Sequence, residues 1–520
     1  MNAALFFSTL LHRLLAPANK HPRLLACGLC VLFAFAVAIA FQSVLPLDII
    51  FVAPDAPVSP YTFSSALHHL FTSPPSLQNL ILLFPPQLAY EGTFWVDSWV
   101  MCLAGLFLLR SRGYSWPAAW VGGFCAAFVG YFATLFCAGH RGVIDALAVT
   151  CLGFGVLARG IASPSPGSAQ RWPWFLLLGG ILAFGLGSQA DIWLLVVCAL
   201  GAYGLWLTSI QWHTHGRRIL RPLLLCTVLT TATFVIVGLP ALNHTFGAAR
   251  AFRSEQLSHA QHTAASPKQA AQARWQFITD WSLPPEDLTE WILPGCRGHT
   301  SYPFDPAPYT GRMGSATQIL RQHAIHVGWF TLLLALLAFF RKRSECPDRL
   351  FWTLLAGLTL LLALGRYTPC YQPIAAIPFL NQIRAPIKWL HLTGFALSML
   401  AGIGADRFLR NRSLFSTWVL CGLIAANGIL VIRPYVFPRD LSHNALTRSV
   451  PKNAHLFNAV HWQALDDICR WHNIPLASTL HEADVVVAPA PQPGRTPLAT
   501  HTIQGITLGL YALKQDLSHD

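Results

Sequence analysis

Long apolar runs alternate with short polar connections along most of this chain, and the pattern predicts the fold. Eleven runs are about the 17 to 25 residues that a helix needs to cross a bilayer. They cover roughly residues 24 to 45, 94 to 110, 116 to 137, 142 to 158, 172 to 188, 191 to 210, 220 to 241, 324 to 340, 350 to 365, 386 to 405 and 414 to 432. We therefore expect an all-α polytopic membrane protein with about eleven transmembrane helices, in a transmembrane domain over residues 1–432.

Three polar segments are longer than ordinary connections. The first outer loop spans residues 46–93, a second large outer loop spans 243–322, and the tail spans 433–520. The tail combines a predicted helix around Trp462 to Trp471 with the apolar runs 484–487 and 506–508, so we expect a small extracytoplasmic α/β region there. Segments of this length are typically functional or disordered.

Composition and charge fix the class and the orientation. The chain is 54% hydrophobic and only 11% charged, which is typical of a membrane protein. Basic residues gather in the short connections on the side that the N-terminus shares, at Arg110, Arg112, Arg159, Arg171, Arg217, Arg218, Arg221, Arg341, Lys342, Arg343, Arg349, Arg407, Arg410 and Arg412. By the positive-inside rule that side is cytoplasmic, and an odd number of spans places the tail outside. The first run, 24 to 45, exceeds the 7 to 15 residues of a signal core, which favours an uncleaved anchor over a cleaved signal peptide.

Acidic residues, in contrast to the basic ones, are concentrated on the predicted outer side of the membrane. Of 22 acidic residues, only Glu345, Asp348 and Asp406 fall on the predicted cytoplasmic side. No lysine or arginine occurs between Pro46 and Asp97, a stretch that contains the acids Asp48, Asp55, Glu91 and Asp97. Acids kept beside hydrocarbon are more often functional than incidental, so we expect the chemistry at the outer face.

Further polar residues occur near the outer ends of the spans. Asp97 opens span two, His140 and Asp145 lie at the connection between spans three and four, and Asp191 opens span six, all on the outer side. A single Asp at a helix N-terminus is also explained by capping and the helix dipole. Their recurrence at one face instead predicts that they line a shared aqueous cavity. Asp97, Asp145 and His140 are candidate ligands for a divalent cation, Mg or Mn, and no other cofactor is expected.

The second large outer loop combines a helix-prone start with aromatic residues. After an Ala/Gln-rich piece to about Trp275, the chain turns at Trp281-Ser-Leu-Pro-Pro-Glu286-Asp287, where Pro285 and the acids predict a helix start. Trp281, Glu286 and Tyr309 are candidate sugar-binding residues. The alternative is a lid that only packs on the membrane surface.

The order of these motifs resembles a known family. An acidic first outer loop, Gly139-His140-Arg141, the Trp281 to Glu286 turn and Arg384-Ala-Pro-Ile-Lys-Trp389 together resemble the YfhO-type bacterial membrane proteins, which are similar to the GT-C glycosyltransferase superfamily. The resemblance covers about residues 20 to 430. It implies a GT-C-like inverting glycosyltransferase of the bacterial inner membrane, with a polyprenyl-phosphate-linked sugar as donor and an envelope glycan, lipid or protein as acceptor. Membrane lipids are the other expected partners. No nucleic acid is expected, and no Gly-Lys-Ser/Thr nucleotide loop occurs.

The resemblance also implies roles for residues. An acid of the first outer loop would act as base toward the acceptor hydroxyl, and Asp55, between Pro54 and Pro57, matches the usual position better than Asp48. The phosphate leaving group is a weak base, so cations can replace a general acid. Candidate cations for the lipid phosphate are Arg384, Lys388, Arg366 and Arg141. The alternative for Arg384 and Lys388 is anchoring to lipid headgroups.

Two other classes of protein fit the same pattern. A membrane transporter or lipid-exporting protein would also gather acids and cations around a cavity, but it is expected to show paired repeats and helices broken at the midplane. The sequence shows no convincing internal repeat. A non-catalytic scaffold for envelope assembly is the third interpretation.

Overall fold

The computed structural model describes the membrane bundle almost completely and parts of the tail. The described residues are 21–41, 49–51, 63–84, 86–137, 140–161, 171–216, 220–263, 267–298, 324–342, 346–377, 380, 383–435, 438–440, 450, 456–458, 474, 476, 483, 485–489, 497–503 and 506–512. Asp48, Asp55 and Tyr309 lie outside these residues, as does the helix expected from Trp462 to Trp471.

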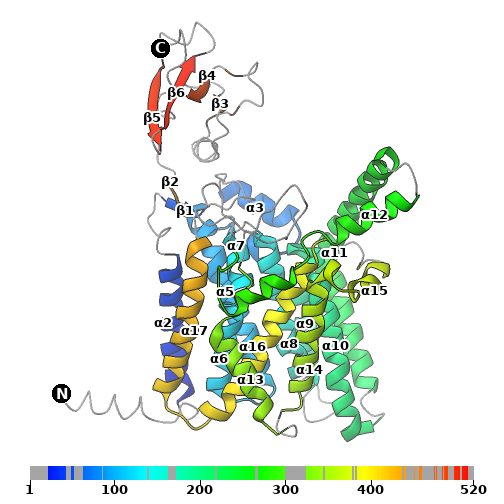
Figure 1. Ribbon diagram of the computed structural model, residues 1–520. Helices are drawn as coiled ribbons and strands as arrows, with labels where there is room; N and C mark the ends of the chain where they lie inside the picture. Colours follow the sequence, from blue (N-terminus) through cyan, green and yellow to red (C-terminus); the bar gives the residue numbers. More distant parts are fainter. Residues whose placement is uncertain are drawn as a thin grey trace, which may run out of the picture.

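Helices dominate the described residues (Figure 1). The α-helices are α2 (Pro22–Ala40), α3 (Phe63–Thr72), α4 (Leu77–Ile81), α5 (Pro86–Ser111), α6 (Trp116–Ala127), α7 (Gly130–Cys137), α8 (Arg141–Ile161), α9 (Trp172–Ser188), α10 (Ala190–His215), α11 (Leu220–Thr263), α12 (Pro267–Ile278), α13 (Trp329–Leu337), α14 (Arg349–Ala363), α15 (Tyr371–Ala376), α16 (Leu390–Leu409) and α17 (Leu414–Ile432). The 3₁₀ helices are η5 (Pro285–Trp291), η6 (Ala338–Phe340), η8 (Gly365–Tyr367), η10 (Pro386–Trp389) and η11 (Arg433–Tyr435). The strands are β1 (Ile49–Phe51), β2 (Pro438–Asp440), β3 (Leu456–Asn458), β4 (Val485–Pro489), β5 (Ala499–Ile503) and β6 (Ile506–Ala512).

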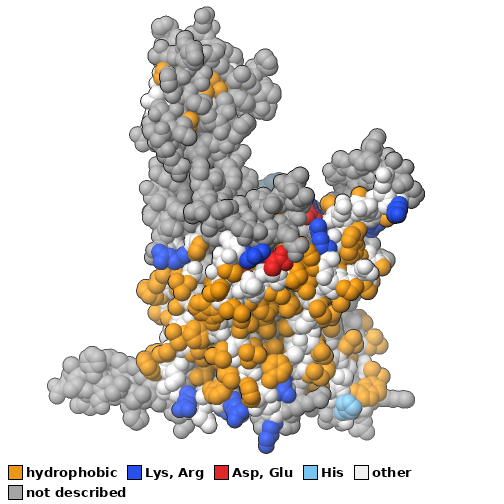
Figure 2. All heavy atoms as spheres, in the orientation of Figure 1, with side chains coloured by type: hydrophobic (Ala, Val, Ile, Leu, Met, Phe, Trp, Pro, Cys, Tyr) orange, Lys and Arg blue, Asp and Glu red, His pale blue; other side chains and the backbone are white. Residues whose placement is uncertain are grey.

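The bundle has the dimensions of a multi-pass membrane protein. Among the described residues, seven helices are long and apolar enough to cross a membrane, and three shorter apolar helices accompany them. Figure 2 shows a broad belt of hydrophobic side chains between two ends where charged side chains occur. We call the end where α5, α8 and α16 begin the upper end and the opposite end the lower end, as drawn in Figure 1. The expected fold class, an all-α polytopic membrane protein, is confirmed, and the described part of the tail contains a small sheet.

Each of the eleven expected spans is helical over most of its length, but one is interrupted. The expected span 116 to 137 is two helices, α6 and α7, separated at Phe128 and Val129. The cause lies in residues 324–328, which are not helical although they were expected to open a span. The N–H of Gly130, the first residue of α7, donates to the carbonyl of His326 at 2.8 Å, and the N–H of Ala324 donates to the hydroxyl of Thr134 at 2.7 Å. The non-helical segment 324–328 therefore packs beside α7 and forms hydrogen bonds with it at Gly130 and Thr134.

Small residues let the central helices approach one another. A Cβ on Gly123 of α6 would lie 2.5 Å from the carbonyl oxygen of Cys102 in α5. A Cβ on Gly404 of α16 would lie 1.9 Å from the carbonyl oxygen of Leu334 in α13. In a bilayer, where lipid is as apolar as leucine, such close contacts are a main source of helix association. They place α16 in the middle of the bundle, with most of its side chains buried.

The second large outer loop begins as a helix. α11 continues without a break from its membrane part to Thr263, well beyond residue 243 where the loop was expected to start. The last fifteen residues of α11, 249–263, extend about 22 Å at 1.5 Å per residue. α12 follows at the upper end, and together they project from the bundle (Figure 1). The turn after Trp281 leads into η5, whose first turn contains the expected acids Glu286 and Asp287.

The lower end is held by ion pairs between helix ends. Asp406 of α16 accepts hydrogen bonds from the Ser115 N–H at 2.9 Å, from Arg341 at 2.9 Å and from Arg410 at 2.8 Å. Arg112 pairs with Asp348 at 2.5 Å. Asp348 and Asp406, two of the three acids that the sequence placed on this side, are thus used to join helix ends.

The tail contains a four-stranded sheet in the order β3-β4-β6-β5. β3 and β4 are parallel, and the other neighbours are antiparallel. The expected apolar runs form β4 and the start of β6, and their side chains Val485, Val487, Leu508 and Leu510 pack together with Leu456. Separately, β1 in the first outer loop pairs with β2, which follows α17, with Ile49 opposite Asp440 and Phe51 opposite Pro438. This pairing ties the first outer loop to the connection that leads into the tail.

Candidate functional site

The upper end of the bundle gathers most of the polar residues that the sequence singled out. Asp97 lies within electrostatic range of Asp145 and Arg141. Asp191 is bonded to Lys388. His391, a residue that the sequence analysis missed, lies within electrostatic range of Lys388, Asp191 and His140. Polar residues from several hairpins therefore lie near one another, and the shared aqueous cavity stays a prediction.

Asp97 is the most unusual of these residues. Its side chain is fully buried, and neither carboxyl oxygen has a hydrogen-bond partner among the described residues. α5 begins at Pro86, so Asp97 lies three turns inside the helix and does not cap its N-terminus. The capping explanation is therefore wrong for this residue. A buried carboxyl group without a partner is costly, which indicates a role other than stability.

Asp145 instead anchors the first outer loop. It is fully buried one turn inside α8, and its Oδ2 accepts the Gln78 N–H at 3.2 Å and the Ser188 hydroxyl at 2.6 Å. Gln78 belongs to the first turn of α4, where backbone N–H groups lack partners within the helix. Asp145 therefore joins α8 and α9 to α4, and only its Oδ1 has no partner among the described residues.

Lys388 is connected to α10. Its ammonium group donates to Oδ2 of Asp191, and both side chains are about a quarter exposed. Asp191 also accepts from the side chain of Gln189 at 3.0 Å and from the Ile192 N–H at 2.8 Å. The pair joins the N-terminal turn of α10 to η10, directly before α16.

Arg366 and Arg384 meet at a second place on the upper end. Nη2 of Arg384 donates to Oδ2 of Asp280 at 3.2 Å, and Nη2 of Arg366 lies 3.5 Å from Oδ1 of the same carboxylate. The Arg384 side chain is 48% exposed and that of Arg366 is 34% exposed, so an anion can approach both from outside. Three of the four predicted phosphate-binding cations are thus divided between the Asp191 pair and this Asp280 group, whereas Arg141 lies within electrostatic range of Asp97.

The backbone around Asp280 is strained. Trp281, a predicted sugar-binding residue, has φ +59° and Ala385 has φ +68°, in the left-handed region that side chains rarely adopt. The Ile387 N–H donates to the Trp281 carbonyl at 3.3 Å, and the Arg366 N–H donates to the Ser282 hydroxyl at 3.0 Å. Trp281 itself is half-buried against the bundle, as is the other predicted sugar-binding residue of this turn, Glu286.

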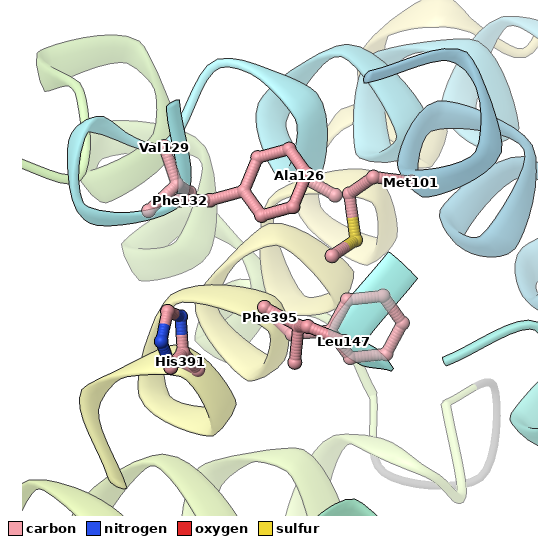
Figure 3. Close-up of a pocket in the computed structure, with 7 residues that line it drawn as sticks. All are labelled: Met101, Ala126, Val129, Phe132, Leu147, His391 and Phe395. Atoms are coloured by element: carbon pink, nitrogen blue, oxygen red, sulfur yellow. The ribbon is translucent and has the colours of Figure 1, made fainter. Parts of the chain in front are cut away.

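Behind the polar residues lies a small apolar cavity (Figure 3). It has room for about one water molecule, with a volume of about 10 Å³. His391 is its polar member, and the other lining residues are Met101, Ala126, Val129, Phe132, Leu147 and Phe395. The His391 ring lies against the tilted ring of Tyr131 with centroids 4.4 Å apart, and neither ring nitrogen of His391 has a hydrogen-bond partner among the described residues. The signal that could have found it is an ionisable residue in the first turn of a span.

The described residues contain no group of three or more His, Cys, Asp or Glu side chains with the geometry of a metal site. The divalent cation expected at Asp97, Asp145 and His140 stays a prediction.

The overall fold is similar to that of a solved membrane protein. The likeness is to ArnT from Cupriavidus metallidurans bound to undecaprenyl phosphate, with a TM-score of 0.50 over 95% of this chain and 100% of that one, at 11% identity. ArnT from the same organism in the apo state gives a TM-score of 0.49 over 95% of this chain and 99% of that one, again at 11% identity. No protein-family model and no curated protein matches the sequence. This likeness supports the expected GT-C-like fold, whereas the finer YfhO-type resemblance is not supported.

Proposed function

We propose that the protein is an inverting glycosyltransferase that moves a sugar from a polyprenyl-phosphate donor to a cell-envelope acceptor. The observation that carries the proposal is the gathering of buried carboxylates and cations at one end of a bundle with the GT-C fold. Undecaprenyl phosphate bound to ArnT, a structure of similar fold, supports a polyprenyl phosphate as the lipid part of the donor.

The upper end is proposed to be the extracytoplasmic face of a bacterial inner membrane. Support comes from the lower end, where the described basic residues concentrate at the helix ends; Figure 2 shows several of them along the bottom of the bundle. Basic residues beside spans favour the cytoplasm. The second large outer loop, the first outer loop and the tail then share the outside with the polar residues of the upper end.

The proposed reaction needs a base, cations for the leaving group and a surface for the sugar. Asp55 is the proposed base that takes the proton of the acceptor hydroxyl, with Asp48 as the alternative; in the chain they flank β1. The donor phosphate leaves as a weak base, and a positively charged residue that stabilises its growing charge replaces a general acid. Arg384, Lys388, Arg366 and Arg141 are proposed for that role.

The proposed sugar surface consists of Trp281, Glu286 and Tyr309. Aromatic faces and a carboxylate together suit the apolar face and the hydroxyl groups of a sugar ring.

The decisive experiment measures donor consumption. The protein, purified in detergent, is incubated with a panel of polyprenyl-phosphate sugars and an envelope extract as acceptor, and release of polyprenyl phosphate is followed. We expect release with at least one donor and none with heat-inactivated protein. Unchanged donors throughout, together with lipid movement across reconstituted vesicles, would instead establish the transporter interpretation.

A further inference from the structure

Two arginines at the upper end share a single carboxylate. Oδ2 of Asp280 accepts a hydrogen bond from Arg384 at 3.2 Å, and its Oδ1 lies 3.5 Å from Nη2 of Arg366. One negative charge faces two positive charges, so the group keeps an excess positive charge. The planar guanidinium fork fits the oxygens of carboxylates and of phosphates equally well. Asp280 therefore occupies a place that a phosphate group also fits.

Both arginines have other contacts besides those to Asp280. Nε and Nη2 of Arg366 donate to the Thr279 carbonyl at 3.1 and 2.8 Å. The Arg384 guanidinium lies 5.0 Å from the ring centre of Phe277, at cation–π distance. By contrast, the two contacts to Asp280 are long and partly exposed, and such ion pairs contribute little to stability. The carboxylate is the part of this group that an incoming anion can replace most easily.

The backbone next to Asp280 also favours its release. Among the described residues, Trp281 and Ala385 are the two non-glycine residues with positive φ. One directly follows Asp280, the other directly follows Arg384, and the Ile387 N–H joins their segments by donating to the Trp281 carbonyl. Strain of this kind persists only where the surrounding contacts impose it, and it is typical of clamps and switches. Loss of the contact to Asp280 removes one of the constraints that impose it.

We infer that Asp280 is an internal competitor that closes a two-arginine phosphate site, and that the phosphate group of a lipid displaces it on binding. The identity of that lipid as the polyprenyl phosphate of the donor rests on the proposed function. The site itself, which consists of Arg366 and Arg384 with Asp280 as its occupant, does not depend on the proposed function. The inference adds regulation to the predicted phosphate-binding role of these arginines, because the empty site is held shut by the protein's own carboxylate.

The test compares the affinity of three proteins for polyprenyl phosphate in detergent, followed by the rise in melting temperature with ligand concentration. Asp280→Asn is expected to bind about tenfold more tightly than the natural protein, the scale of one charged hydrogen bond. Asp280→Asn combined with Arg384→Gln is the matched control, and it is expected to lose that gain. An unchanged or weaker affinity in Asp280→Asn would overturn the inference.

Two further ligands distinguish the source of the phosphate. A gain with inorganic phosphate as well as with polyprenyl phosphate would support a site for the phosphate group alone. A gain restricted to polyprenyl phosphate would support a site that also requires the lipid chain. A gain with phosphatidylglycerol vesicles equal to that with polyprenyl phosphate would assign the site to bulk anionic lipid and would overturn the donor assignment.

A second measurement needs no substitution at all. Hydrogen exchange of the natural protein reports the Ile387 and Arg366 amides, which donate to the Trp281 carbonyl and the Ser282 hydroxyl. Added polyprenyl phosphate is expected to speed exchange at both amides as the contact opens. Unchanged or slower exchange in the bound protein would contradict displacement. Faster exchange without any sugar transfer would retain this inference and refute the proposed function alone.

Discussion

Asp97 and Asp145 lie close together near the upper end, yet their surroundings differ. Asp145 accepts hydrogen bonds that hold α4, whereas Asp97 has no partner for either oxygen among the described residues. The same residue type therefore stabilises the fold at one position and costs stability at the other. This contrast can be measured by substitution with leucine, which has nearly the same shape as aspartate and no polar atom.

Asp97→Leu is expected to raise the melting temperature in detergent while lowering sugar transfer. Removal of a buried polar group without a partner recovers about 1–3 kcal/mol of stability. Asp145→Leu, the matched control, is expected to lower the melting temperature because the N–H of Gln78 and the hydroxyl of Ser188 lose their acceptor. A fall in melting temperature for Asp97→Leu would show that the carboxylate has a stabilising partner.

Asp55→Asn is expected to reduce turnover by about 10²–10⁴, the usual contribution of a general base. Expression and melting temperature are expected to stay close to those of the natural protein. Turnover per folded molecule, measured with a polyprenyl-phosphate sugar, checks the prediction. If Asp48→Asn shows the large loss and Asp55→Asn does not, the base is Asp48.

Residue types at the upper end were predictable, but their pairing was not. An excess of acids on one side of the membrane and cations before span ten are visible in the sequence. That Lys388 bonds Asp191 and Arg384 bonds Asp280 depends on how α10 and the loop before η5 pack against η10. These contacts join residues about 100 to 200 positions apart, and no local pattern encodes them. His391 was missed because a single histidine hardly changes an apolar run.

At the scale of elements, the sequence predicts helices well and interruptions poorly. Apolar runs of sufficient length gave the spans, because backbone groups in lipid must be bonded within a helix. The break between α6 and α7 arises from the insertion of residues 324–328, whose carbonyl at His326 accepts the Gly130 N–H. Residues 128–129 contain no proline or other local breaker. The helical start of the second large outer loop was expected from its Ala/Gln-rich composition, but its unbroken continuation from the membrane part of α11 was not, since a polar helix outside the membrane has no apolar periodicity to reveal where it begins.

The pairing of β1 with β2 predicts an abrupt dependence of activity on chain length. A chain that stops after Tyr435 lacks β2, so β1 loses its antiparallel partner. We expect it to lose transfer, whereas a chain that stops after Asp440 keeps the pairing and a large part of the activity. Turnover per folded molecule of the two chains provides the comparison. Equal turnover in both would show that β2 does not position the first outer loop.

At the scale of the whole molecule, the two ends of the bundle use their charged residues differently. The lower end uses Asp348 and Asp406 to join helices through arginines. The upper end contains buried or half-exposed polar residues whose pairs include cations accessible from outside. This asymmetry, more than the number of spans, supports a site at one face.

The orientation follows as a prediction with a simple readout. A reporter that is active only outside the cytoplasm, fused after Asp520, is expected to be active. One that is active only in the cytoplasm, inserted between Arg341 and Arg349, is expected to be active as well. Cytoplasmic activity of the fusion after Asp520 would reverse the proposed orientation and place the upper end inside the cell.

The strand pair β1–β2 also sets a time order for synthesis. β1 leaves the ribosome before nearly all of the bundle, and its partner follows about 390 residues later. At 5–20 residues per second the interval is roughly 20–80 s. During that interval the loop with both candidate bases lacks the strand that ties it down. The nascent chain therefore completes this strand pair only after α17 has been made, so an unfinished bundle does not contain the proposed site in its final form.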